Sequence, residues 1–253
     1  MSNADDTEAS DRPTRRSFGA VLPAAVQRVL HATVVIDYQN VHLVGHNLFP
    51  STKHRPRHDS LVDPLLFAQT WARVRNEAQR PGMPACDVAK VLVYRGLPSP
   101  EHDADAYARN QAQKAHWERD SRVTVIHRPL KYEYQRDADG HSATDATGIR
   151  IVTGKREKGI DVLCALAFIR EAQRPETDLV MLASTDTDLE PALDEALEYG
   201  TAKIETCSWY DPAQRHRSKE LRPSPPRRIW NTRLHEPDYN RSWDPTNYHQ
   251  HRP

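Results

Sequence analysis

The chain has 253 residues, in which 35 Lys and Arg residues balance 35 Asp and Glu residues. A formal net charge of zero gives no overall attraction to a polyanion, so any affinity for nucleic acid has to come from local patches. About 180 residues carry an alternating strand and helix pattern, a size at which one core buries most of its apolar surface. We therefore expect one domain at 31–210, after a disordered or partly helical segment at 1–30 and before a basic tail at 211–253.

The N-terminal segment contains one stretch with features of a targeting signal. Residues 14–26 (TRRSFGAVLPAAV) begin with paired arginines and continue into an apolar run, as in a twin-arginine signal. The run stops after about 8 residues, at the low end of the length that a signal needs. No other stretch approaches the ~20 apolar residues of a membrane helix. We expect a cytoplasmic protein, and a signal role for this stretch stays open.

Apolar runs and turn residues predict an alternation of strands and helices along the domain. Asp63 and Pro64 suit the start of a helix. The expected elements are a strand at 33–36, a helix at 61–78, a strand at 88–96, a polar helix at 103–120, a strand at 122–130, a helix buried on most sides at 159–172, a strand at 179–185, a helix at 189–200 and a strand at 202–210. This order predicts a Rossmann-like α/β fold with a mainly parallel central sheet.

A polar excursion at 131–157 interrupts the alternation. Two alternating runs about Asp139 and Gly140 predict a β-hairpin or a mobile loop. The excursion ends in a basic stretch shortly before an aspartate, Asp161. It is therefore a second place to look for substrate contacts.

Three basic residues are candidates to bind substrate. Arg156 and Lys158 stand just before Asp161, where their charges could hold phosphates. Lys158 could equally form a salt bridge with an active-site acid. Arg95 stands near the end of the predicted strand at 88–96, directly after the run KVLVY, and is the third candidate.

Four aspartates fall at the ends of predicted strands or the starts of helices: Asp37, Asp161, Asp186 and Asp188. The carboxyl ends of parallel strands converge on the crevice where ligands bind. Carboxylates placed closely together raise each other's pKa unless a hard divalent cation such as Mg²⁺ or Mn²⁺ neutralises them. Taken singly, each aspartate also suits a helix cap, a first-turn acid or an Asx-turn. All four aspartates lie at the same end of the alternating strand and helix units. We therefore predict that they form one metal site.

Three segments resemble the NYN domain in their order and spacing: IDYQN at 36–40, KGIDV at 158–162 and STDTDLEP at 184–191. This family belongs to the PIN-like nucleases and includes the LabA-like proteins. The resemblance covers residues 33–210 and implies a PIN-like three-layer fold, bound Mg²⁺ or Mn²⁺, and metal-dependent cleavage of RNA. It implies that Asp37, Asp161 and Asp186 are the catalytic metal ligands, with Asp188 as a fourth and Asn40 as a polar supporter at the substrate.

One position departs from the resemblance. Ala167 stands where we expect relatives to have an aspartate one helical stretch after the KGIDV segment. If that acid serves the metal elsewhere in the family, the metal affinity of this chain is lower.

A metal held by clustered carboxylates suits the cleavage of phosphodiester bonds. Phosphodiester cleavage needs a nucleophile at neutral pH and charge relief on the phosphate, and a carboxylate-held metal supplies both. The sequence has no GxSxG elbow, no GxxxxGK[ST] loop and no metal or redox spacing among its three cysteines. Because the resemblance to the NYN domain implies RNA as the substrate, we predict a metal-dependent endoribonuclease. Two alternatives stay open: a non-catalytic RNA-binding or regulatory adaptor, and a phosphatase or flap-type DNA nuclease that uses the same ions.

The C-terminal segment is basic, with nine Lys and Arg residues against four acids from Pro212 onward. It also carries four aromatic residues: Trp230, Tyr239, Trp243 and Tyr248. This composition suits contact with single-stranded RNA or with a protein partner. It equally suits an extended segment that wraps the domain and buries its rings, or a disordered tail.

Two further residue types receive simpler roles. His42 and His46 lack the glutamate of an HExxH helix, so we expect polar loop residues. Cys164 and Cys207 lie in apolar runs and are expected in the core.

Overall fold

A computed structural model describes residues 28–213 and 215–248 of the chain, so the twin-arginine stretch at 14–26 lies outside the described residues. The strands are β1 (Leu30–Asp37), β2 (Cys86–Leu97), β3 (Val123–Pro129), β4 (Lys131–Tyr134), β5 (Val152–Arg156), β6 (Leu179–Ala183), β7 (Lys203–Asp211), β8 (His216–Arg217) and β9 (Trp230–Leu234). The α-helices are α1 (Tyr38–Leu48), α2 (Pro50–Lys53), α3 (Pro64–Ala78), α4 (Ala104–Trp117), α5 (Ile160–Ala172), α6 (Glu190–Tyr199) and α7 (Glu236–Arg241). Two short 3-10 helices complete the elements, η1 (Arg57–Asp59) and η2 (Thr187–Leu189).

The central sheet has the order β3-β2-β1-β6-β7-β8, and β9 also pairs with β7. Strands β3, β2, β1, β6, β7 and β9 run parallel, and within the described part of this central sheet only the short β8 is antiparallel to its neighbour. The strand order turns back between β1 and β6, since β2 and β3 lie on one side of β1 and β6 and β7 on the other. The expected α/β fold with a mainly parallel sheet is confirmed.

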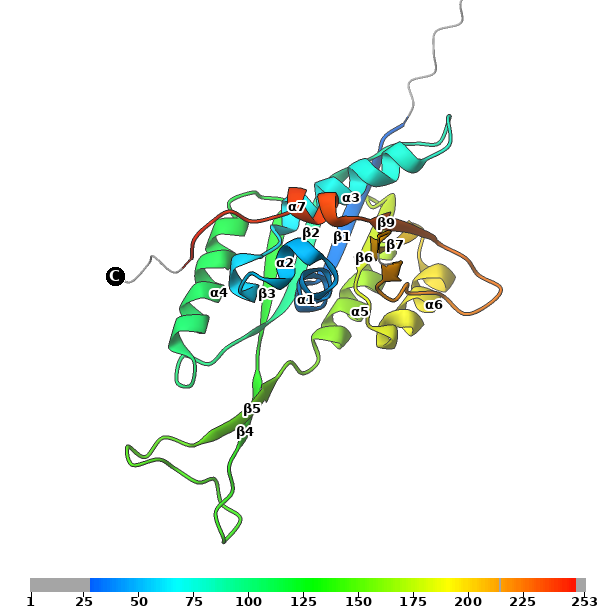
Figure 1. Cartoon of the computed structure of the whole chain (residues 1–253). Coiled ribbons are helices and arrows are strands. Elements are labelled where there is room, and N and C mark those ends of the chain that lie inside the picture. The colour runs from blue at the N-terminus through cyan, green and yellow to red at the C-terminus, as the bar shows by residue number, and fades with distance from the viewer. Residues whose placement is uncertain (1–27, 214, 249–253) are drawn as a thin grey trace, which may run out of the picture.

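Helices cover both faces of this sheet and form a hydrophobic core on each (Figure 1). Along β1, Val34 and Ile36 pack into the core beneath α1 and α3, whereas Val35 packs into the core beneath α5 and α6. Strands buried on both faces are apolar without interruption, which explains the run at 33–36. At the start of α3, Asp63 accepts a hydrogen bond from the Leu66 N–H at 2.8 Å, as a helix cap does. No helix within the described ranges has the length and apolarity that crossing a bilayer requires.

Helix α1 begins immediately after Asp37 and was not expected from the sequence. It contains His42 and His46, which are buried rather than polar loop residues, so that prediction was wrong. Burial lowers the pKa of His42 to about 3, and the His46 Nδ1 atom lies 2.7 Å from the Ser60 hydroxyl oxygen. These histidines therefore belong to the interior of the layer above the sheet.

Helix α5 is less buried than the sequence predicts. Its Cys164 side is in the core, as expected, but Val162 and Leu166 are 55% and 51% exposed. Apolar composition cannot tell which side of such a helix faces water, because all of its faces are similar. Cys207 is also buried, as expected.

The excursion at 131–157 forms a two-stranded antiparallel ribbon of β4 and β5 that extends away from the sheet and its helices (Figure 1). The ribbon pairs the two ends of the excursion, and an isolated antiparallel bridge between Arg136 and Ser142 flanks Asp139 and Gly140. Between β4 and β5, Asp137 and Asp145 each accept hydrogen bonds from backbone N–H groups two and four residues later. Each aspartate thus closes its own turn, which divides the tip of the ribbon into two loops.

The C-terminal segment is part of the domain. Strand β9 lies beside β7 in the sheet, and Tyr239 in α7 is 1% exposed. Tyr248 is also buried, and its hydroxyl donates to the Asp244 carboxylate at 2.6 Å. Trp230 and Trp243 remain partly exposed. Of the alternatives, the structure favours a segment that wraps the domain and buries part of its aromatic rings.

Close packing of α1 against α7 leads to a prediction. A Cβ atom at Gly45 would lie 2.5 Å from Cε2 of Tyr239, whose ring is held by a hydrogen bond of 2.7 Å from its hydroxyl to the Ser60 carbonyl. We expect Gly45→Ala to lower the free energy of unfolding by about 1–3 kcal/mol, because the ring cannot move away freely. Urea unfolding measures this change. In a Tyr239→Leu background the same substitution should cost less, and equal costs in both backgrounds would show that this contact is unimportant.

Candidate functional site

A pocket of about 740 Å³ lies at the carboxyl end of β1. It is lined by residues of α1, of the connection between β5 and α5, and of the loop after β6. The polar lining residues are Asp37, Gln39, Asn40, Arg156, Glu157, Lys158, Asp161 and Asp186. Segments that are far apart in the sequence thus meet at one edge of the sheet, where the strand order turns back.

Parallel pairing of β1 with β6 creates the centre of this pocket. Ile36 is opposite Ala183, so the next residues, Asp37 and Ser184, leave the two strands together. The Ser184 hydroxyl donates to Asp37 Oδ2 at 3.0 Å, and its oxygen accepts from the Asp186 N–H at 3.1 Å. Ser184 therefore links the two aspartates that the sequence places in one site.

Asn40 holds the loop that follows β6. Its Oδ1 atom accepts hydrogen bonds from the Thr185 N–H at 2.9 Å and the Thr185 hydroxyl at 2.8 Å. Asn40 also lines the pocket. Its local role is to fix the start of α1 against the segment that carries Asp186.

The carboxyl group of Asp37 is an unusually poor place for a negative charge. Asp37 is only 6% exposed, and this burial is the main reason why its pKa rises to about 7. The hydrogen bond from Ser184 opposes this rise, whereas the charges of Glu157 and Asp186 add to it. Near neutral pH, Asp37 is therefore balanced between its protonated and its charged form.

Glu157 is a pocket residue that sequence reasoning missed. It accepts a hydrogen bond from the Gly96 N–H, and a Cβ atom at position 96 would lie 2.7 Å from its Oε1 atom. Burial raises the pKa of Glu157, while the Gly96 N–H and Arg95 oppose this effect. No local pattern singles out Glu157 within its charged run, because its partner is 61 positions away.

The other predicted acids differ in position. Asp161 lies in the first turn of α5 and lines the pocket, and Asp186 lines it from the start of η2. Asp186 also accepts from the Asp188 N–H at 3.1 Å, so its capping role coexists with its place in the pocket. Asp188 is exposed on η2 and is not among the described residues that line the pocket. The structure thus brings together Asp37, Asp161 and Asp186, with Glu157 beside them.

Of the three predicted basic residues, two lie at the pocket and one lies away from it. Arg156 and Lys158 are exposed at the pocket, and Lys158 forms no ion pair with any described residue. Arg95 lies outside the pocket lining: its guanidinium stacks 4.6 Å from the Tyr38 ring centre and donates to Gln113 at 2.7 Å. Arg95 is thus engaged in the interior of the domain, because its guanidinium stacks there on a buried ring.

The pocket supplies oxygen ligands of the kind that Mg²⁺ and Mn²⁺ prefer. The high pKa of Asp37 shows that its charge lacks full compensation from the protein itself. Across residues 28–213 and 215–248, however, no group of three or more His, Cys, Asp or Glu side chains is arranged so that it could hold a metal ion. The donor chemistry therefore fits a hard cation, but the described carboxylates do not form a ready-made site for it.

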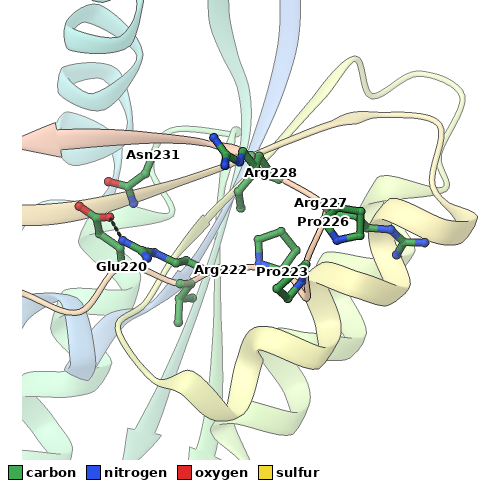
Figure 2. Close-up of a pocket in the computed structure, with 10 residues that line it drawn as sticks. Glu220, Arg222, Pro223, Pro226, Arg227, Arg228 and Asn231 are labelled. Carbon is green, nitrogen blue, oxygen red and sulfur yellow. Dashed lines mark hydrogen bonds and ion pairs between the residues drawn. The ribbon is translucent and has the colours of Figure 1, made fainter.

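A separate pocket of about 510 Å³ is lined by residues between 220 and 231, in the segment that leads into β9 (Figure 2). Its arginines are largely used within the protein: Arg222 pairs with Glu220 at 3.1 Å, as Figure 2 shows, and Arg227 pairs with Glu198 of α6. The pocket contains one acid, Glu220, among its lining residues. It therefore lacks the convergent carboxylates of the first pocket.

Comparisons with known proteins add little to this geometry. No family model and no curated protein matches the chain. A crystal structure of a protein of unknown function from Vibrio parahaemolyticus is similar to 74% of this chain and 84% of that chain, with 18% identity and a TM-score of 0.39. The geometry of the pocket of Asp37, Asp161 and Asp186 is therefore the main indication of function.

The burial of Asp37 predicts a specific dependence of stability on pH. Because its pKa is raised from 3.8 to about 7, the stability that protonated Asp37 contributes is complete below pH 3.8 and is lost as the pH rises through about 7. We expect metal-free Asp37→Asn to be more stable than the parent at pH 8, by on the order of a few kcal/mol. This difference should shrink toward pH 4. Urea unfolding across this range measures it, and a difference independent of pH would contradict the assignment.

Proposed function

We propose that this protein is a metal-dependent endoribonuclease that cleaves RNA phosphodiester bonds. The observation that carries the proposal is the convergence of Asp37, Asp161 and Asp186, from three separate segments, on one open pocket. Acids placed around a common space repel an anionic substrate unless a cation joins them. A pocket of this kind suits a hydrolase that works on phosphates with a bound divalent ion.

Under this proposal, Asp37, Asp161 and Asp186 hold Mg²⁺ or Mn²⁺, and Glu157 is the additional carboxylate within reach of the same space. When bound, such an ion acidifies a water molecule and relieves negative charge on the phosphate. Ser184 and Asn40 keep Asp37 and the Asp186 loop in position through their hydrogen bonds. Asp188, exposed on η2, has at most an indirect part in this site.

The basic rim supports a polyanionic substrate. Arg156 and Lys158 lie beside the acids on the connection between β5 and α5, where they can bind backbone phosphates. The chain as a whole is neutral, so this rim provides the local attraction that nucleic-acid binding needs. The resemblance of the three acidic segments to the NYN domain, a PIN-like family, agrees with RNA as substrate.

One observation favours the alternative of a non-catalytic RNA-binding adaptor. The described side chains contain no ready-made group of three metal ligands. An adaptor would bind RNA through the rim and would not cleave it with any divalent ion. Cleavage and binding assays on the same protein separate the two functions.

Neutralising single acids tests the catalytic proposal. We expect Asp37→Asn and Asp186→Asn each to reduce Mn²⁺-dependent cleavage of single-stranded RNA by about 100-fold or more, since a metal site supplies several kcal/mol of charge stabilisation. Glu195→Gln is the matched control, because it removes an exposed carboxylate of α6 that lies outside the pocket lining. Circular dichroism verifies the fold of each variant. Full activity in both aspartate variants would reject the proposed site.

Cation binding can also be measured without activity. At pH 8, Mn²⁺ should raise the melting temperature of the parent, because a ligand that binds only the folded state stabilises it by about 2.7 kcal/mol at one hundred times its Kd. Asp161→Asn should lose most of this shift, and EDTA should reverse it in the parent. Equal shifts in the parent and in Asp161→Asn would place the ion elsewhere.

A further inference from the structure

A further pocket of about 430 Å³ adjoins the pocket of Asp37, Asp161 and Asp186, which we call the acidic pocket. We call this further pocket the second pocket. It is lined by Arg128, Lys158, Gly159, Asp161, Val162 and Leu163. Lys158, Gly159 and Asp161 line both pockets. The two spaces therefore form one continuous surface, with Asp161 common to both.

Two cations at the second pocket have no ion-pair partner among the described residues. Arg128 at the end of β3 and Lys158 are both exposed, and neither forms an ion pair with any described residue. Other surface arginines do pair, such as Arg122 with Asp120 at 2.9 Å and Arg174 with Glu171 at 3.1 Å. The positive charge at this pocket is thus available to an anion from solution.

Gly159 brings the Arg128 guanidinium close to the backbone. A Cβ atom at position 159 would lie 3.3 Å from the Arg128 Cζ atom, and Gly159 has a φ of +75°, which favours glycine. The guanidinium consequently lies over the link between Lys158 and Asp161. This position is beside the acidic pocket, so an anion bound there would be next to one held at the acids.

Part of the lining of the second pocket is apolar. Val162 and Leu163 line it, and Val162 is more than half exposed. An isolated phosphate would leave this apolar surface in water, whereas a nucleotide has a phosphate for the cations and a ring for the apolar side chains. The lining therefore matches a nucleotide better than a simple anion.

We propose that this second pocket binds the RNA nucleotide adjacent to the cleaved phosphodiester bond, with its phosphate on Arg128 and Lys158 and its base against Val162 and Leu163. This inference rests on the proposed function, because it takes the acidic pocket as the place of cleavage. It assigns Arg128 and Val162 as substrate-binding residues. Neither was identified from the sequence.

Equilibrium binding of a fluorescein-labelled single-stranded RNA 12-mer to the full-length protein, in EDTA and at several salt concentrations, tests this assignment. We expect Arg128→Gln to weaken binding roughly 3- to 10-fold at low salt and to reduce the salt slope by about 0.7, the loss of one phosphate contact to a single strand. The matched control is Arg80→Gln, which removes another exposed positive charge that lies outside the lining of both pockets. Val162→Ser should weaken binding without changing the salt slope.

The outcomes separate this inference from the catalytic proposal. If the parent cleaves RNA but Arg128→Gln binds with the affinity and salt slope of Arg80→Gln, the second pocket is rejected while the nuclease proposal stands. If Arg128→Gln loses affinity but no divalent ion produces cleavage, the pocket is supported as an RNA site and catalysis is rejected. Loss of affinity together with a raised KM and an unchanged kcat supports both.

Discussion

The pairing of β1 with β6 is the constraint on which the pocket depends. Ile36 is opposite Ala183, so the chain leaves both strands at the same level and Asp37 meets Ser184. A slip of one residue would turn the side chains of one strand to the other face and separate these partners. The two cores hold this register, because residues on both faces of β1 are buried. The site is thus a consequence of how the sheet is packed.

This arrangement has an energetic cost. A carboxyl group that is 6% exposed, with Glu157 and Asp186 nearby, loses hydration and gains repulsion when it ionises. The rest of the domain has to offset this loss through apolar burial on both sides of the sheet. The Ser184 hydroxyl and the Asn40 backbone N–H favour the charged form of Asp37, but together they do not offset the effect of burial. Placement at an unfavourable position is typical of residues kept for function rather than for stability.

Much of the fold could be predicted from the sequence, because buried parallel strands and capped helices have strong local patterns. The run at 33–36 and the Asp63 cap are examples in which the local pattern and the structure agree. Helix α1 could not be predicted in the same way, since it follows the strand directly and no side chain caps it. The convergence of Asp37, Asp161 and Asp186 followed from the topology of parallel strands. Glu157 could not be found, because its contact with Gly96 depends on the path of the ribbon.

A neutral chain can still attract a polyanion when its charges are separated locally. The pocket has Asp37, Glu157, Asp161 and Asp186 around its space, while its cations lie on the exposed connection before α5. An RNA strand would be attracted to Arg156 and Lys158 but repelled by the acids that line the same pocket. A divalent ion at the acids reverses that repulsion at the point where a phosphate has to approach. Under the proposed function, binding at the rim therefore tolerates the absence of metal, whereas close approach to the acids requires it.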